Sequence, residues 1–403
     1  MSDSSGFRNV ILSLAFLVTF SVHLLMFSYG PLVSSIISEM SLNFTQASLI
    51  FSASIIAITV IRIPWGICCD HIGFKKSLGI GLFIMGIFGF LRGFSGTFIE
   101  LLIYQLFLGV GVSAVIPAMP HMVSNWFPKE KIGNATGIYV AGFAFGNMIG
   151  LALTPFLLSL FGGWREVFRA YGIFEIVLTI IWWVLVKEYP NSSIRSQKEE
   201  KNSSLPFKDN FITILKQKET WLLSGLIFIC MGCFDSLSLW LPSILESEGF
   251  VLTTAGIIAS LLALGFLITS PVSGTLADRF PRKRIMLILG VLSGPAIFLI
   301  GLDFSISILV APFLAGFFLM GIMTVAFMIP VDHPKLSPYV ASAAAIISSI
   351  GNLGSFILPV MVGYTRDLTG AFFVALLLLA IMGEITVLLA FALKESNENG
   401  KRN

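Results

Sequence analysis

Residues 66–76 read GICCDHIGFKK, and residues 274–284 read GTLADRFPRKR. Both stretches place an aspartate four residues after a glycine and follow it with Lys or Arg, and they begin 208 positions apart. A second matching pair, Gly146-Asn147 and Gly351-Asn352, is 205 positions apart. Two shared patterns at nearly one spacing indicate an internal duplication of about half the chain.

The composition predicts that this chain lies in a membrane. Of its 403 residues, 56% are hydrophobic and 12% are charged, whereas an ordinary soluble domain has about 25% charged residues. A helix that crosses the hydrocarbon core needs about 20 apolar residues. The sequence therefore predicts twelve membrane-spanning helices and an all-α membrane protein. The predicted segments are residues 10–36, 46–69, 77–96, 98–122, 133–160, 166–187, 221–245, 251–277, 284–302, 305–330, 339–363 and 370–393.

The distribution of Lys and Arg predicts the orientation, because cytoplasmic loops are enriched in these residues. With both termini in the cytoplasm, 20 of the 25 Lys and Arg residues lie on the cytoplasmic side. The outer side keeps Arg92, Arg165, Arg169 and Arg366, and Arg62 alone lies within a span. We therefore predict a multi-pass protein of the cytoplasmic membrane with both termini inside.

The duplication and one long polar segment together predict the domain organisation. Residues 190–219 are rich in charged residues and lie midway along the chain. We predict an N-terminal six-helix bundle in residues 1–189, a cytoplasmic linker in 190–219 and a C-terminal six-helix bundle in 220–403.

Several classes of function find no support in the sequence. The four cysteines lack the spacing of a disulfide framework or a zinc site, so no metal is expected. No nucleotide-binding loop or catalytic triad is present, so we predict neither an enzyme nor a cofactor. The net charge of +3 comes without a basic stripe, and no nucleic-acid partner is expected.

The repeated glycine–aspartate pattern resembles the helix 2–3 loop signature of the major facilitator superfamily, usually written G-x-L-A-D-R-x-G-R-K. The resemblance implies two pseudo-symmetric six-helix bundles and transport by alternating access. It also implies that the two loops act as a conformational latch at the inner ends of the helices. The candidate latch residues are Gly66, Asp70, Gly73, Lys75, Lys76, Gly274, Asp278, Arg279 and Arg282. The second copy has Pro281 where the first has Gly73; proline cannot adopt a positive φ, so the two turns must differ.

Within the superfamily, the chain most resembles the nitrate/nitrite porter branch. The resemblance rests on Arg62 in helix 2 and on the segments around Asn147 in helix 5 and Asn352 in helix 11. In that branch such residues form the anion site, which makes Arg62, Asn147 and Asn352 the candidate substrate-binding residues. The branch also has an arginine in helix 8, where this chain has Ser270, so cyanate or a monocarboxylate-like anion stays open beside nitrate and nitrite. Gln105 stands where many members of the superfamily carry an arginine in helix 4.

Arg62 lies about 12 Å from the inner end of its helix, because it precedes Asp70 by eight residues at about 1.5 Å per residue. A central Arg costs about 2.5–3.5 kcal/mol on insertion scales, so its side chain should face a cavity or a partner. We expect an anionic substrate there. The alternatives are a structural ion pair, for example with Asp235, and extension of the side chain to the inner interface.

Three further ionisable residues within the spans are candidates for proton coupling: Asp235, Glu175 and His23. Each could instead have a packing or hydrogen-bonding role. Gly142, Gly146 and Gly150 recur every four residues in helix 5, which predicts close helix packing.

The sequence thus predicts a secondary active transporter that moves a small anion, by uniport or by symport with a proton. We expect it to work in a bilayer, with a monomer sufficient for transport. An organic-solute or drug exporter of the same fold is the alternative. A membrane sensor that does not transport is a second alternative, which the retention of both loop signatures disfavours.

Overall fold

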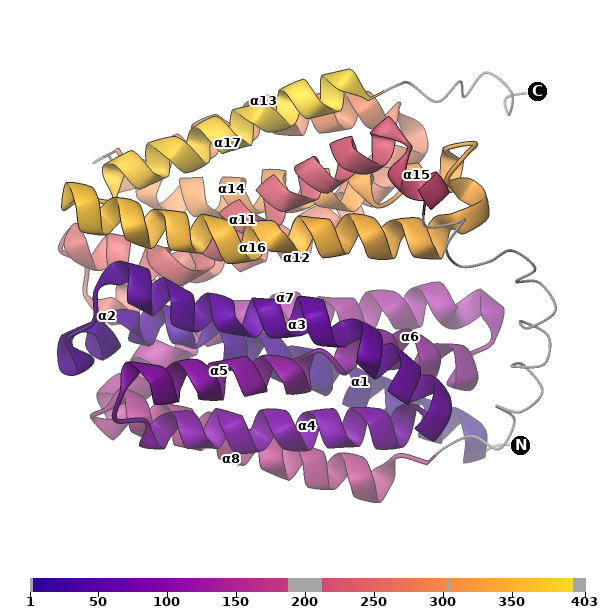
Figure 1. Ribbon diagram of the computed structural model, residues 1–403, viewed down its shortest axis with the longest axis horizontal. Helices are drawn as coiled ribbons and strands as arrows, with labels where there is room; N and C mark the ends of the chain where they lie inside the picture. The colour runs from indigo at the N-terminus through magenta and orange to yellow at the C-terminus, as the bar shows by residue number, and fades with distance from the viewer. Residues whose placement is uncertain (1–2, 188–211, 303–304, 394–403) are drawn as a thin grey trace. The chain divides into compact units, whose positions relative to one another are not determined.

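The computed structural model describes residues 3–187, 212–302 and 305–393, and their regular structure is helical (Figure 1). Twelve stretches of these residues, some of them two consecutive helices, are long and apolar enough to cross a membrane. The predicted all-α architecture with twelve spans is therefore confirmed. Below, "inner" means the helix ends predicted to face the cytoplasm and "outer" means the opposite ends.

The chain divides into two units. The first comprises Met1–Asn202 and Ser238–Ser260, and the second comprises Ser203–Leu237 and Leu261–Asn403. The outer parts of two helices from the second half are thus grouped with the N-terminal helices. The predicted boundaries 1–189, 190–219 and 220–403 stay a prediction, and residues 190–211 lie outside the described part of the chain.

Eight α-helices and one 3-10 helix come from the N-terminal half. They are α1 (Asp3–Phe27), α2 (Tyr29–Met40), α3 (Phe44–Ile72), α4 (Phe74–Leu91), η1 (Arg92–Phe94), α5 (Phe98–Val112), α6 (Val115–Trp126), α7 (Lys129–Phe161) and α8 (Trp164–Leu185). The closest packing here joins α1 to α7, α4 to α8 and α3 to α5.

The C-terminal half contributes the remaining described helices. They are α11 (Lys218–Ser247), α12 (Leu252–Arg279), α13 (Arg282–Ile300), α14 (Ser305–Ala326), α15 (Ile329–Asp332), η2 (Ser337–Tyr339), α16 (Val340–Thr369) and α17 (Phe373–Ala392). In the second unit, α13 packs along both α14 and α17.

Three of the predicted spans are each broken into two helices, and a proline accounts for each break. A proline ring clashes with the carbonyl group four residues earlier and supplies no N–H to it. Pro31 stands four residues after the last residue of α1, and Pro330 stands four residues after the last residue of α14. Pro117 likewise follows the interruption at Ser113 and Ala114 between α5 and α6.

Glycines set how closely the helices approach. A Cβ atom added to Gly142 of α7 would lie 2.6 Å from the carbonyl oxygen of Phe16 in α1. One added to Gly146 would clash with the carbonyl oxygen of Phe20, so the predicted close packing along this face is confirmed. Backbone-to-backbone approach of this kind is common between membrane helices.

The same glycine-based approach occurs in both halves. A Cβ on Gly109 of α5 would overlap the backbone of Ser54 in α3, and one on Gly316 of α14 would overlap the backbone of Leu262 in α12. These two contacts are related by offsets of 207 and 208 residues, close to the 208 between the loop signatures. The duplication is therefore visible in the packing as well as in the motifs.

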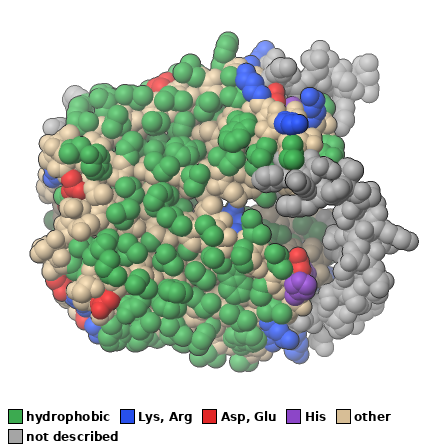
Figure 2. Space-filling view, in the orientation of Figure 1, with side chains coloured by type: hydrophobic (Ala, Val, Ile, Leu, Met, Phe, Trp, Pro, Cys, Tyr) green, Lys and Arg blue, Asp and Glu red, His purple; other side chains and the backbone are tan. Residues whose placement is uncertain are grey.

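Large apolar side chains face away from both units. Ile63, Val184, Leu388 and Phe391 are among those most exposed, each at 68–71% of its surface. Figure 2 shows hydrophobic side chains along the helices of the visible face, with most charged side chains near the helix ends. Exposed apolar area on this scale identifies surface that contacts lipid.

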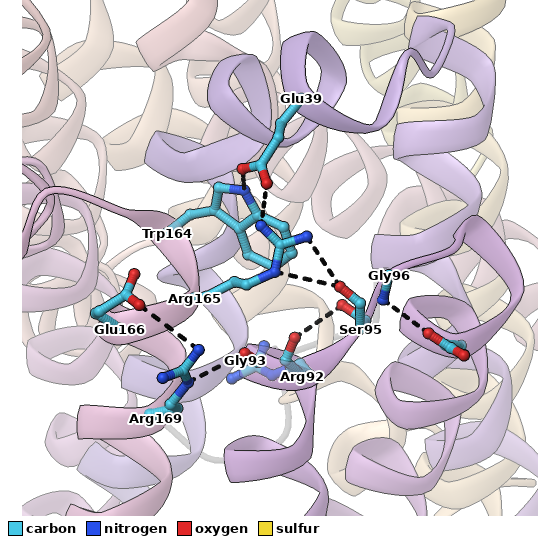
Figure 3. Close-up of polar contacts among 10 residues, drawn as sticks. Glu39, Arg92, Gly93, Ser95, Gly96, Trp164, Arg165, Glu166 and Arg169 are labelled. Atoms are coloured by element: carbon cyan, nitrogen blue, oxygen red, sulfur yellow. Dashed lines mark hydrogen bonds and ion pairs between the residues drawn. The ribbon is translucent and has the colours of Figure 1, made fainter.

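A polar cluster joins the outer ends of α2, η1, α5 and α8 (Figure 3). The Glu39 carboxylate accepts hydrogen bonds from Trp164 Nε1, at 2.6 Å, and from Arg165. Arg165 also donates to the carbonyl oxygen of Ser95, and Arg169 donates to that of Gly93 at 3.1 Å. In this cluster, α8 therefore supplies hydrogen-bond donors to the carbonyl groups around η1.

Arg92 lies fully buried beneath this cluster rather than facing the outer solution. Its Nη1 donates to the carbonyl oxygen of Leu25 and to Oε1 of Gln105, both at 3.1 Å. Its guanidinium carbon lies 4.2 Å from the centre of the Phe168 ring. The arginine thus joins α1, α5 and α8 through neutral partners and a cation–π contact.

Because the α1–α7 approach depends on the absence of a Cβ atom, Gly142→Ala should destabilise the protein by about 1–3 kcal/mol. Gly137→Ala is the matched control on the same helix. A Cβ at position 137 has nothing within 4 Å, so the gain in helix propensity should leave stability unchanged or up to about 1 kcal/mol higher. Thermal unfolding of the purified variants measures both; equal melting temperatures would contradict the packing argument.

Candidate functional site

Arg62 lies in α3 with its side chain half-buried. One turn later, Trp65 Nε1 donates to the carbonyl oxygen of Val110 at 2.8 Å, which fixes this part of α3 against α5. Pro64 lies inside the same helix. The cation is thus carried by a firmly packed region in the inner half of the span.

Asn147 and His23 lie together in the first unit. Asn147 is fully buried in α7, and a Cβ added to its neighbour Gly146 would lie 3.1 Å from the Cβ of His23 in α1. The His23 ring packs against Phe143 and Phe27, with ring centres 4.7 and 5.0 Å away. The imidazole thus lies beside two phenyl rings at the close approach of α1 to α7, and Asn147 directly follows the glycine that permits this approach.

Glu175 of α8 lies against a different side of α1. It is fully buried in α8, near Ser21, and its Cγ would lie 3.4 Å from a Cβ on Gly86 of α4. The Ser21 hydroxyl is the polar group beside its carboxyl oxygens, and that hydroxyl donates to the carbonyl oxygen of Val18 at 2.9 Å. Ser21 and His23 are two positions apart on one helix and so face opposite ways, which separates Glu175 from the group around Asn147.

Asn352 and Asp235 lie in the second unit, both buried. Asp235 of α11 lies beside Ser355, which is one turn after Asn352 on α16. A Cβ on Gly354 would overlap the backbone of Phe228, so α16 approaches α11 closely here. The candidate amide and carboxylate of the second half therefore come from two adjoining helices.

Ser270 of α12 occupies the position where the resemblance to the nitrate/nitrite porters implies an arginine. Ser270 of α12 donates within its own helix, to the carbonyl oxygen of Phe266 at 3.3 Å. Among the residues that the structure describes, no cluster of His, Cys, Asp or Glu is arranged to hold a metal ion.

The two candidate latch loops have different turns, as the sequence predicts. Gly73 joins α3 to α4 with φ 84° and ψ 160°, whereas Pro281 precedes α13 with φ −55° and ψ 123°. A Cβ added to Gly274 would have nothing within 4 Å, and one added to Gly66 would make an ordinary contact with Pro117 at 4.0 Å. Asp70 and Asp278 are both exposed. The Lys75 ammonium lies 5.9 Å from the Trp183 ring centre, and Lys76 and Arg279 are on the surface.

Arg282 is the loop residue with the most extensive contacts. It forms an ion pair with Asp332 of α15 and donates to the carbonyl oxygen of Met328. Met328 lies at the break between α14 and α15, and its carbonyl oxygen also accepts from the backbone N–H of Val331 at 3.3 Å. Arg282 therefore fixes the inner end of α13 to this break.

Two polar residues of interest were not identified from the sequence. Arg92 was predicted only as an outer cation, yet it reaches Gln105, where the superfamily often has an arginine of its own. Ser238 of α11 was not singled out, yet its Oγ accepts a hydrogen bond from Asn147 Nδ2 at 3.4 Å. The position of Arg92 in an apolar run was a usable signal, whereas nothing in the sequence pairs Ser238 with Asn147.

Twelve apolar helices, a duplicated half and polar groups buried within the spans define a membrane transporter, and comparison with known proteins gives its family. The model of the Major Facilitator Superfamily matches residues 15–255 and 249–403. The chain belongs to this superfamily, whose members transport solutes and are not enzymes.

Curated relatives cover nearly the whole chain. A probable nitrate transporter NarT of Staphylococcus haemolyticus (strain JCSC1435) is 26% identical over 384 residues, which are 94% of each chain. The protein of the same name from Staphylococcus aureus (strain MRSA252) is 25% identical over 391 residues, 95% of this chain and 94% of the relative.

Two solved structures show the same fold. A bacterial homolog of the human lysosomal transporter Spinster, in an inward-facing and unoccupied conformation, gives a TM-score of 0.74 at 18% identity and covers 95% of each chain. A D-xylose–proton symporter gives 0.75 at 16% identity, covering 96% of this chain and 98% of its own.

Because Arg282 pairs with Asp332 and caps the carbonyl group of Met328, Arg282→Gln should lower the stability of the protein by about 1–2 kcal/mol. Arg279→Gln removes the same charge three residues earlier from an exposed side chain, and should change stability by less than about 0.5 kcal/mol. Thermal unfolding in detergent gives both values. If Arg279→Gln were the more destabilising of the two, the assigned role of Arg282 would be wrong.

Proposed function

We propose that this chain transports a small inorganic anion, nitrate or nitrite, across the cytoplasmic membrane. The observation that carries the proposal is the similarity, over 94–95% of the chain, to proteins named as probable nitrate transporters. Arg62, Asn147 and Asn352 are the proposed binding residues, and alternating access of the two bundles is the proposed mechanism.

The chemistry of these residues suits an ion that only accepts hydrogen bonds. Arg62 brings a fixed positive charge, and each asparagine amide brings two N–H donors. A single anion about 4 Å from the Arg62 charge would gain roughly 4 kcal/mol at an effective dielectric constant near 20, before the cost of desolvation. That gain favours binding and still permits release, which a carrier requires.

The single cation favours a monovalent substrate. With Ser270 in α12 in place of an arginine, the proposed site holds one positive charge rather than two. A divalent anion would keep an uncompensated negative charge in a low-dielectric interior, which is costly.

We propose further that a proton accompanies the anion and that Glu175 carries it. A carboxyl group that is fully buried in a span, beside a serine hydroxyl, is a candidate for proton transfer. Asp235 and His23 are the other candidates. The cytoplasmic location of both termini, predicted from the Lys and Arg distribution, remains part of this proposal.

Nitrate at a hundredfold excess over its Kd should raise the melting temperature of the purified wild type by about 2–5 °C, because a ligand that binds only the native state stabilises it. Arg62→Ala should show no such rise, and Arg62→Lys should show a reduced one. Arg284→Gln, which removes an exposed arginine of α13, should respond like the wild type.

Two results would contradict the proposal. If no small monovalent anion stabilises the wild type, the substrate belongs to another class, such as an organic solute. If Arg62→Ala responds as the wild type does, Arg62 has a structural role and the anion binds elsewhere.

Glu175→Gln should abolish the stimulation of nitrate uptake by an inward proton gradient and leave nitrate exchange between the two sides intact, because the amide cannot carry a proton. Uptake into proteoliposomes with and without a pH gradient measures this, and Asp235→Asn is tested in parallel. Loss of stimulation in Asp235→Asn alone would move the proton site to α11.

A further inference from the structure

The side-chain amide of Asn147 and the hydroxyl of Ser238 form an isolated, fully buried polar pair. Both residues have no exposed surface. Asn147 Nδ2 donates to Ser238 Oγ at 3.4 Å, while Asn147 Oδ1 has no hydrogen-bond partner among the described residues. An unsatisfied amide oxygen in a protein interior is rare and calls for an explanation.

The hydroxyl of Ser238 also differs from that of its neighbour on α11. Ser236 donates to the carbonyl oxygen of Gly232 in its own helix, at 2.6 Å. The hydrogen bond of Ser238 is the one that it accepts from Asn147, so within the described residues its own proton is donated to no acceptor. One unused acceptor, Asn147 Oδ1, therefore lies beside one unused donor, the Ser238 hydroxyl.

The backbone of Ser238 is held firmly enough to position a neighbour. A Cβ added to Gly30 of α2 would lie 2.6 Å from the carbonyl oxygen of Ser238 and 3.0 Å from that of Leu239. Two residues further on, the Trp240 ring packs against Phe44, with 5.6 Å between ring centres. The hydroxyl thus belongs to a closely packed segment.

A half-turn of the Asn147 amide would pair the unused acceptor with the unused donor. Ser238 would then donate its proton to Oδ1, because a hydroxyl can act as donor or acceptor. Both N–H groups of the amide would become available to a ligand. In the orientation that the structure shows, one N–H group is bonded to Ser238 and the oxygen, which would repel an anion, is the unpaired atom.

We propose that Ser238 is a positioning residue for the anion: by donating to Asn147 Oδ1, it holds the amide with both N–H groups toward the substrate. This inference rests on the proposed function and specifies the substrate further. An amide held in this way offers donors and no acceptor, so it suits nitrate or nitrite. It disfavours a neutral, protonated carboxylic acid, which must donate a proton of its own.

The test compares the nitrate Kd and the nitrate uptake kinetics of the wild type, Ser238→Ala and Ser238→Thr. Removing the hydroxyl should raise Kd and KM by about three- to tenfold, the effect of one hydrogen bond. The maximal uptake rate and the melting temperature of the ligand-free protein should stay close to those of the wild type. Ser238→Thr keeps the hydroxyl and should restore most of the affinity.

Two matched variants separate positioning from general packing. Ser236→Ala removes an equally buried hydroxyl that bonds only within its own helix, and should leave Kd within about twofold of the wild type. In an Asn147→Ala background, Ser238→Ala should have no further effect on Kd, because the amide that it positions is gone.

The outcomes distinguish this inference from the proposed function. If nitrate binds the wild type and Arg62→Ala loses binding, but Ser238→Ala keeps the wild-type Kd, the positioning role is wrong and the anion site stands. The positioning role would also be wrong, and the anion site would stand, if Ser236→Ala weakened nitrate binding as much as Ser238→Ala does. If nitrate does not bind the wild type at all, the proposed function is wrong, and the role of Ser238 falls with it.

Discussion

A lipid interior offers no water, so each polar group inside it must find its partner within the protein. The fold follows from this constraint at several scales. Backbone groups are satisfied inside helices, and at the breaks between helices side chains such as Arg282 and Arg165 supply further donors to carbonyl groups. Arg92 is accommodated in the same way, by a carbonyl group, an amide and a phenyl ring. Among the described residues, the buried carboxyl group of Glu175 and the unpaired amide oxygen of Asn147 are then places where a proton or a solute could bind.

The two halves share their packing but have diverged in their chemistry. The contacts of Gly109 with Ser54 and of Gly316 with Leu262 are equivalent, as the offsets between them show. At the loops, however, Pro281 stands at the position that corresponds to Gly73, and the two backbones turn differently. The cation of α3 has only the hydroxyl of Ser270 as its counterpart in α12. Packing tolerates few changes because a single Cβ atom would separate two helices, whereas side chains that face a solute can change independently in each copy.

The sequence was sufficient to predict the class of fold, since long apolar segments and a repeated motif can be recognised without knowledge of distant contacts. It also correctly predicted the close packing at Gly142 and Gly146 and the unlike turns at Gly73 and Pro281. It did not reveal that three spans are broken, although Pro31, Pro117 and Pro330 mark the places, because many prolines here lie within unbroken helices. The burial of Arg92 and the pairing of Asn147 with Ser238 depend on residues far apart in the chain. Arg62, Asn147 and Asn352 came from family resemblance, and their joint role remains a prediction.

The break at Ser28 makes the outer end of the first span a separate helix of 12 residues, yet this helix is anchored along its length. Near its start, Gly30 lies against the carbonyl group of Ser238, and at its end Glu39 binds Trp164 and Arg165 of α8. Loose segments move in about nanoseconds to microseconds, whereas packed elements rearrange collectively in about microseconds to milliseconds. A fluorescent or spin label on α2 should therefore report the slower motion, in step with α8, despite the break in the helix that precedes it.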